Sequence, residues 1–246
     1  VMLYDVGYGM TQVAIGDNLL IRSWIETVVR LNNSFIVKRN IPVRQILEAS
    51  QRLSAYIHHT IRDTKESVWI AQREGRAKDS NDRTQSSVLK MLAIGGSHEN
   101  LIENLMELNI VPVAISYEYD PCDYLKAKEF QQKRDNPDFV KSQRDDLLSM
   151  ETGILCNKGR VHFTLTQPIN ELLAQVDRSL DKNGLVTAAA NIIDREIYKN
   201  YRFYPCNYVA YDLLMGTRRF QDHYGVTDKK HFEEYLQGQI EKVDLE

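Results

Sequence analysis

Basic side chains follow two strand-like stretches of the sequence. SFIVK (34–38) leads into Lys38 and Arg39, and SVWIAQ (67–72) leads into a loop with a glycine and several cations. Arginine presents a planar fork of donors that grips phosphate oxygens in pairs, lysine adds a point charge, and glycine lets a ligand approach the backbone. The pattern predicts an anion-binding site, for which the candidates are Lys38, Arg39, Glu74, Gly75, Arg76 and Lys78. The competing interpretation, solvated surface charges, is weaker for two such clusters than for one.

Alternating strand-like and helix-like segments must position these residues. Strand patterns occupy 11–16, 34–38, 67–72 and 110–117, and helical patterns occupy 21–32 and the stretch from Pro42 to about Asp63. Such alternation predicts an α/β fold with three layers, in which helices flank a mainly parallel sheet. Because parallel strands end at one edge of a sheet, we expect the two cationic clusters to converge there.

The rest of the chain is expected to complete one domain over residues 1–246. A half-buried strand is predicted at 159–169, followed by additional C-terminal helices. We therefore place the core at about 11–170 and a helical extension at about 171–246. A chain of 246 residues with 43% hydrophobic content is long enough to bury such a core.

Composition argues against several classes of protein. The net charge of −3 gives no global attraction to nucleic acid. Three scattered cysteines without a C-x-x-C pair indicate no zinc or redox site and favour a reducing cytoplasm, and KDSND (78–82) lacks the ligands of a calcium loop. We expect no metal, no signal peptide and no membrane-spanning helix.

The order of the motifs resembles the glycerolipid acyltransferase family. FIVKR (35–39), Glu74-Gly75-Arg76, and IVPV (110–113) with Tyr117 and Glu118 are similar to the second, third and fourth motif blocks of glycerol-3-phosphate acyltransferases. The late strand VHFTLTQPI (161–169) is also similar, so the resemblance covers residues 11 to 170 approximately. In the family, one variable residue separates the glycine from the arginine, whereas here Ala77 occupies the arginine position.

The resemblance implies transfer of a fatty acyl group from a thioester to a hydroxyl of glycerol 3-phosphate or lysophosphatidate. Lys38, Arg39 and either Arg76 or Lys78 would hold the phosphate, and Glu74 with Gly75 would shape the acceptor site. On the acyl side, the resemblance places Pro112 and Val113. The resemblance implies that no cofactor is bound and that acyl-CoA or acyl carrier protein is the co-substrate. It also implies that the protein associates peripherally with the inner face of the cell membrane. The segment 21–32 could lie at that interface, although we favour a core-facing helix there.

The first block of the family, a histidine and an aspartate with four residues between them, is expected upstream of Val1, because no histidine precedes Phe35. That histidine would deprotonate the acceptor hydroxyl. Two later pairs have this spacing, His58 with Asp63 and His223 with Asp228. The two residues of the first pair would lie roughly 140° apart around a helix, and the second pair comes after the other motif blocks in the sequence. We interpret both pairs as structural, so no catalytic residue is assigned in this chain.

Three alternatives remain open. The acceptor could be a lyso-aminolipid without a phosphate, or the chain could be a non-catalytic protein that binds lipid or acyl carrier protein. A nucleotide-binding α/β domain is disfavoured because the sequence contains neither G-x-G-x-x-G nor a P-loop.

Overall fold

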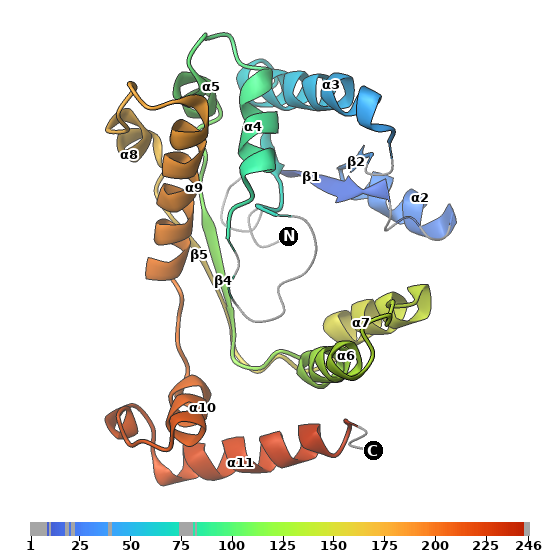
Figure 1. Ribbon diagram of the computed structural model, residues 1–246, viewed down its shortest axis with the longest axis vertical. Coiled ribbons are helices and arrows are strands. Elements are labelled where there is room, and N and C mark those ends of the chain that lie inside the picture. Colours follow the sequence, from blue (N-terminus) through green and yellow to red (C-terminus); the bar gives the residue numbers. More distant parts are fainter. Residues whose placement is uncertain are drawn as a thin grey trace. The chain divides into compact units, whose positions relative to one another are not determined.

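The computed structural model describes residues 9, 11–17, 20, 23–38, 41–73, 81 and 83–243 (Figure 1). Its contacts divide the chain into two compact units. The first comprises Val1–Pro112 and Leu165–Lys199, and the second comprises Val113–Thr164 and Asn200–Glu246. The expectation of one cooperative domain stays a prediction.

A parallel sheet organises the first unit. Strands β1 (Thr11–Gly16), β2 (Ser34–Val37) and β3 (Ser67–Trp69) run parallel in the order β2-β1-β3. Gly16 is in register with Val37, and Val13 is in register with Trp69. The carboxyl ends of β2 and β3 therefore lie at the same sheet edge, on either side of β1, and the predicted α/β class is confirmed.

Helices α2 (Ser23–Leu31) and α3 (Val43–Arg62) connect these strands. Proline is tolerated just before α3 because its missing N–H would lack an intrahelical partner there. The C-terminal half of α3 faces the core, where Ile57 is 2% exposed, whereas Ile46 and Leu47 near its start are exposed. The rings of Phe35 in β2 and Tyr56 in α3 make an edge contact at 5.2 Å, which fixes the helix against the sheet.

Four further helices complete the core of the first unit. They are α4 (Ser86–Ile94), α5 (Leu101–Glu107), α8 (Asn170–Ala174) and α9 (Lys182–Lys199). Leu89, Ile102, Leu105, Leu173, Val186, Ala189 and Ile193 are among the buried side chains. The predicted C-terminal helices thus supply part of this core, with α9 packed along α4 and α5 (Figure 1).

The second unit contains a two-stranded ribbon of β4 (Val113–Tyr117) and β5 (Val161–Leu165) with helices α6 (Asp123–Asp135), α7 (Gln143–Leu155), α10 (Pro205–Met215) and α11 (Val226–Ile240). A 3-10 turn, η2 (Gln221–His223), joins the last two helices. Backbone bonds from Glu118 N to the Arg160 carbonyl and from Thr166 N to the Pro112 carbonyl make the ribbon antiparallel. The strand expected at 110–117 therefore forms, but it pairs with β5 instead of joining the parallel sheet.

No helix in the described ranges combines the length and the apolar character needed to cross a membrane.

Candidate anion-binding site

Lys38 follows the last residue of β2 at the carboxyl edge of the sheet. Val37 is paired with Gly16, so Lys38 stands one residue beyond the ladder, and its side chain is exposed. A lysine in that position can turn toward a ligand at the sheet edge without breaking a packing contact. Arg39 lies outside the described residues.

The second cluster, Glu74, Gly75, Arg76 and Lys78, also lies outside the described residues, although both flanks of its segment are described. The chain leaves β3 after Trp69, runs through Gln72 and Arg73, and is described again from Arg83. Because β1 separates β2 from β3, the two strands that lead into the clusters are about 10 Å apart, twice the usual strand spacing.

The two flanks of this segment are tied together by hydrogen bonds. The backbone N–H of Gln85 donates to the carbonyl of Gln72 at 2.9 Å. Thr84 donates both its backbone N–H, at 2.8 Å, and its hydroxyl, at 2.6 Å, to Oδ1 of Asp194 in α9. Thr84 is 8% exposed, so these bonds are largely shielded from water. The segment between Gln72 and Thr84 therefore starts and finishes at fixed points near the carboxyl edge of the sheet.

Sequence reasoning missed Asp194. Its only signal is local: Asp194 shares a helix face with Ala190 and Ile197, which are buried, and an acid on an apolar face requires a partner. Nothing in the sequence identifies that partner as Thr84, 110 positions away.

The two residues predicted for the acyl side stand at the start of β4. Pro112 is buried and its carbonyl accepts a hydrogen bond from Thr166 N at 3.1 Å, while Val113 is half-buried. Pro112 belongs to the first unit and Val113 to the second. Their role toward an acyl chain stays a prediction.

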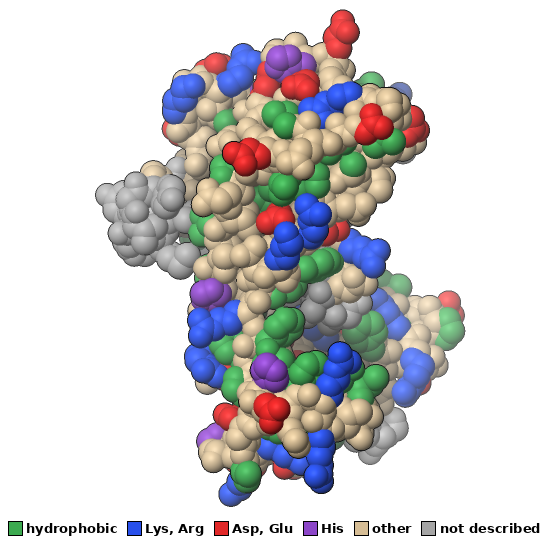
Figure 2. All heavy atoms as spheres, turned by 90° about the vertical axis from the view of Figure 1, so that its left-hand side faces the viewer, with side chains coloured by type: hydrophobic (Ala, Val, Ile, Leu, Met, Phe, Trp, Pro, Cys, Tyr) green, Lys and Arg blue, Asp and Glu red, His purple; other side chains and the backbone are tan. Residues whose placement is uncertain are grey.

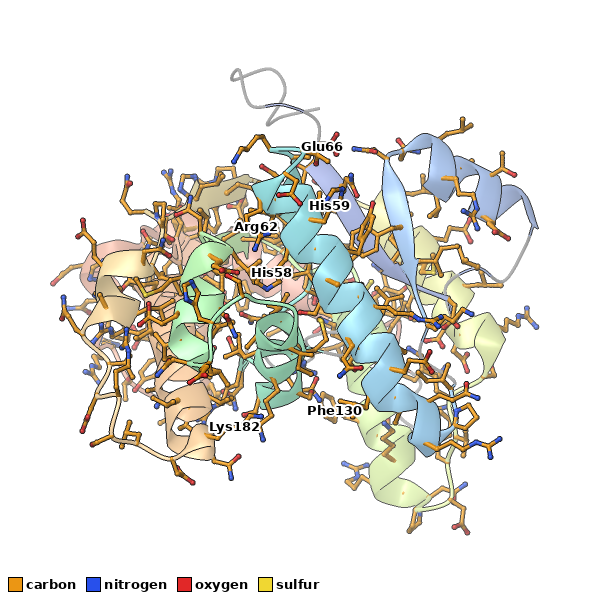
Figure 3. All side chains as sticks on the ribbon, turned by 90° about the horizontal axis from the view of Figure 1, so that it is seen from above. His58, His59, Arg62, Glu66, Phe130 and Lys182 are labelled. Atoms are coloured by element: carbon orange, nitrogen blue, oxygen red, sulfur yellow. The ribbon has the colours of Figure 1, made fainter. Side chains whose placement is uncertain are left out.

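His58 is a structural residue of α3. Its Nε2 donates to the Leu92 carbonyl at 2.9 Å, and its Nδ1 lies 3.0 Å from Oε2 of Glu107 without making a hydrogen bond in the described structure. Asp63 instead meets His59, with 2.6 Å between Oδ2 and Nδ1. Figure 3 labels both histidines on α3. The contacts of His58 thus brace α3 against α4 and α5, and His58 does not pair with Asp63, as the helical geometry predicted.

Glu107 gathers several groups around its carboxylate. Ser97 donates to it from its hydroxyl, and His98 Nε2 lies 3.2 Å from Oε1. Burial raises the pKa of Glu107, but the hydrogen bonds from Ser97 and the charges of His58 and His98 outweigh burial, so the net pKa lies below its ordinary value. This cluster holds a charge in the fold and links α3 to α5 through His58 and Glu107.

The second histidine pair is structural as well. The ring of His223 stacks on Tyr208 with centroids 4.4 Å apart, while Oδ2 of Asp228 accepts the N–H of Gly225 at 2.8 Å. Asp228 therefore caps the start of α11.

Glu118, the acid of the fourth motif block, is held by Arg160. The guanidinium donates to Glu118 through Nε at 3.1 Å and Nη2 at 2.7 Å, and it also lies over the Tyr204 ring. These bonds lower the pKa of Glu118 below its ordinary value. The thiol of Cys206 donates to the Glu118 carbonyl, and burial raises the pKa of Cys206 to about 11. Cys206 is thus a protonated packing residue at neutral pH and a poor nucleophile.

Outside the predicted anion site, the charge of the described surface is mixed. Basic and acidic side chains are both spread over the face that Figure 2 shows. Within the described part of the chain, no three His, Cys, Asp or Glu side chains gather as metal ligands. Comparisons with protein-family models, with curated proteins and with solved structures found no match to the chain.

Proposed function

We propose that the protein is an acyltransferase of phospholipid synthesis, acting on glycerol 3-phosphate or lysophosphatidate. The observation that carries the proposal is the placement of Lys38 and the flanks of the 73–83 segment at one carboxyl edge of a parallel sheet. Ligands of open α/β sheets bind at that edge. The order of the motif blocks along the sequence supplies the reaction class.

In the proposed reaction, the acceptor hydroxyl attacks the thioester carbonyl, the carbon–sulfur bond breaks, and the thiol of the donor leaves. Lys38, Arg39 and Arg76 or Lys78 hold the phosphate, while Glu74 and Gly75 shape the acceptor site. Pro112 and Val113 border the acyl chain. The proton of the acceptor hydroxyl passes to a histidine base of the kind that the family resemblance implies.

Transfer without an acyl-enzyme is supported by the cysteines. Cys206 is buried with a raised pKa, which keeps its thiol protonated at neutral pH, and the Cys122 thiol donates to the Ser149 carbonyl. Direct attack of the acceptor hydroxyl on the thioester is therefore proposed, because it needs no cysteine nucleophile.

A thioester-release assay tests the proposal. Long-chain acyl-CoA and acyl carrier protein serve as donors, with glycerol 3-phosphate, lysophosphatidate or a lyso-aminolipid as acceptor. We expect release that depends on a phosphate-bearing acceptor. Release with the lyso-aminolipid alone would favour the phosphate-free alternative, and no release with any acceptor would favour a non-catalytic binding protein.

A further inference from the structure

The end of α10 presents large apolar side chains to solvent. Its last three residues are Leu213, Leu214 and Met215, which are 42%, 85% and 57% exposed. The chain then turns at Gly216, where a φ of 63° favours glycine. Single exposed leucines are ordinary, but aliphatic side chains that are exposed together mark a surface that contacts a partner or a lipid.

Three hydrogen bonds hold the chain beyond this turn against α10. Oδ1 of Asp212 accepts the Thr217 hydroxyl at 2.8 Å. Oδ2 accepts the Phe220 N–H at 3.0 Å and the Tyr224 hydroxyl at 3.0 Å. Asp212 is 4% exposed, and a buried carboxylate is stable only when such donors surround it. The turn therefore has a defined position on α10, and the exposure of the aliphatic side chains is a fixed feature of the fold.

Two arginines follow the turn and make this end of α10 basic. Arg218 and Arg219 are exposed, and no acid lies between residues 213 and 221, so these two arginines give the stretch a charge of +2 in a chain of net charge −3. Arg219 is oriented by its neighbours, because its Cζ lies 5.2 Å from the centroid of the Phe220 ring and its Nη1 donates to the Tyr211 hydroxyl at 3.5 Å. A guanidinium next to aliphatic side chains matches a phospholipid, whose phosphate lies next to its acyl chains.

Aromatic rings support the arginines. The ring of Phe220 makes an edge contact with Tyr211 at 5.0 Å and lies 5.4 Å from the ring of Tyr208. Tyrosine is typical of the layer between the headgroups and the acyl chains of a bilayer. A protein partner would need a pocket for Leu214 and acids opposite both arginines, whereas an anionic bilayer offers acyl chains and phosphates at every point of its surface. The chemistry of this end of α10 therefore favours a lipid.

We propose that residues 213–219, the α10 tip, bind the surface of an anionic phospholipid bilayer. Leu214 and Met215 enter the acyl-chain layer, and Arg218 and Arg219 contact the lipid phosphates. The tip lies beyond the part of the sequence that resembles the acyltransferases. Its purpose, holding the enzyme at the membrane that receives a lipid product, rests on the proposed function, whereas its binding to the bilayer does not.

Sedimentation of the full chain with vesicles tests the tip without any acyl donor or acceptor. Vesicles of equal parts phosphatidylcholine and phosphatidylglycerol supply the anionic surface, and vesicles of phosphatidylcholine alone supply the neutral one. We expect binding to the anionic vesicles that Leu214→Ala weakens by about 10-fold or more, because a leucine side chain no longer leaves water. Replacing both Arg218 and Arg219 by glutamine should weaken it by about 30-fold, the factor for losing two cations near an anionic surface.

Matched variants elsewhere in the chain serve as controls. Leu155 is 73% exposed in α7, so Leu155→Ala removes the same side chain from another helix of the second unit. Arg52→Gln combined with Arg62→Gln removes two exposed arginines from α3. Both controls should stay within about 2-fold of the original binding, because charges remote from a contact are screened by salt. Unchanged urea unfolding midpoints verify that every variant keeps its fold.

Three outcomes would overturn the tip. They are no binding to anionic vesicles, equal weakening by Leu214→Ala and Leu155→Ala, or a dimer in analytical ultracentrifugation that Leu214→Ala dissociates while vesicles are not bound. The last outcome would assign the tip to a second copy of the chain. Vesicle binding requires no turnover, so a protein that binds through the tip but releases no thiol with any acceptor keeps the tip and loses the proposed function. A protein that turns over without binding vesicles keeps the function and loses the tip.

Discussion

Of the residues proposed to hold the phosphate, Lys38 is the one that lies within the described part of the chain. Its side chain is exposed at the end of β2, so Lys38→Ala should leave the free energy of unfolding within about 0.5 kcal/mol of the original. It should raise KM for glycerol 3-phosphate by about 10-fold, because a charge-assisted contact is lost. Lys182→Ala, at another exposed lysine of the first unit, is the matched control. A KM unchanged by Lys38→Ala would remove Lys38 from the site.

The buried carboxylate of Glu107 predicts a pH dependence of stability. Its pKa in the folded chain lies below the unfolded value of about 4.3, so its contribution is fully present above that value. The contribution is then lost as the pH falls through the lower folded pKa. Glu107→Gln should reduce the free energy of unfolding by about 1 to 3 kcal/mol at pH 7. Urea unfolding from pH 7 to pH 3 measures the difference between the two proteins, which should shrink toward acid; a constant difference would contradict the assignment.

Two glycines of the α4–α5 connection make close contacts, Gly95 with α3 and Gly96 with Asn104 in α5. A Cβ on Gly95 would stand 2.6 Å from the backbone N of Ala55, and a Cβ on Gly96 would stand 2.2 Å from the Asn104 side chain. Asn104 cannot easily move, because it bonds the carbonyls of Ala93 and His98. Both contacts are closer than atoms tolerate, so a methyl group at either position forces the elements apart.

Gly95→Ala should therefore lower the free energy of unfolding by about 1 to 3 kcal/mol, the usual cost of overpacking. Gly238 in α11 has open space around its Cβ position and supplies the control. Gly238→Ala should stabilise by about 0.5 to 1 kcal/mol, since alanine favours a helix interior. Denaturant unfolding compares the two variants, and a neutral Gly95→Ala would show that the two elements can separate freely.

The segments that sequence periodicity predicted best are those whose packing is local. The helix expected from Pro42 to about Asp63 spans Val43–Arg62, and the strand expected at 11–16 spans Thr11–Gly16. Pairing between distant segments was harder to predict, because β-branched alternation at 113–117 fits a parallel sheet as well as a separate ribbon. For the same reason, the local sequences do not identify Thr84 as the partner of Asp194, whereas the predicted carboxyl-edge position of Lys38 follows from strand direction alone.

At the scale of the whole molecule, each compact unit has buried residues of its own. Ile193 is 6% exposed in the first unit, and Val209 is 0% exposed in the second. Truncating either side chain to alanine removes apolar contacts inside one unit, at a cost of about 2 to 5 kcal/mol for the isoleucine. The two variants therefore distinguish one cooperative domain from two separately stable units.

Native-state amide hydrogen exchange is the measurement that separates these possibilities. We expect Ile193→Ala to accelerate exchange in α4, α5 and α9 while leaving α10 unchanged, because local opening follows the contacts that were lost. Val209→Ala should show the reverse pattern. In α10, the Asp212 carboxylate accepts bonds from Thr217, Phe220 and Tyr224, which gives the second unit its own polar anchor. Equal acceleration in both units by either variant would instead establish the single domain that the sequence predicted.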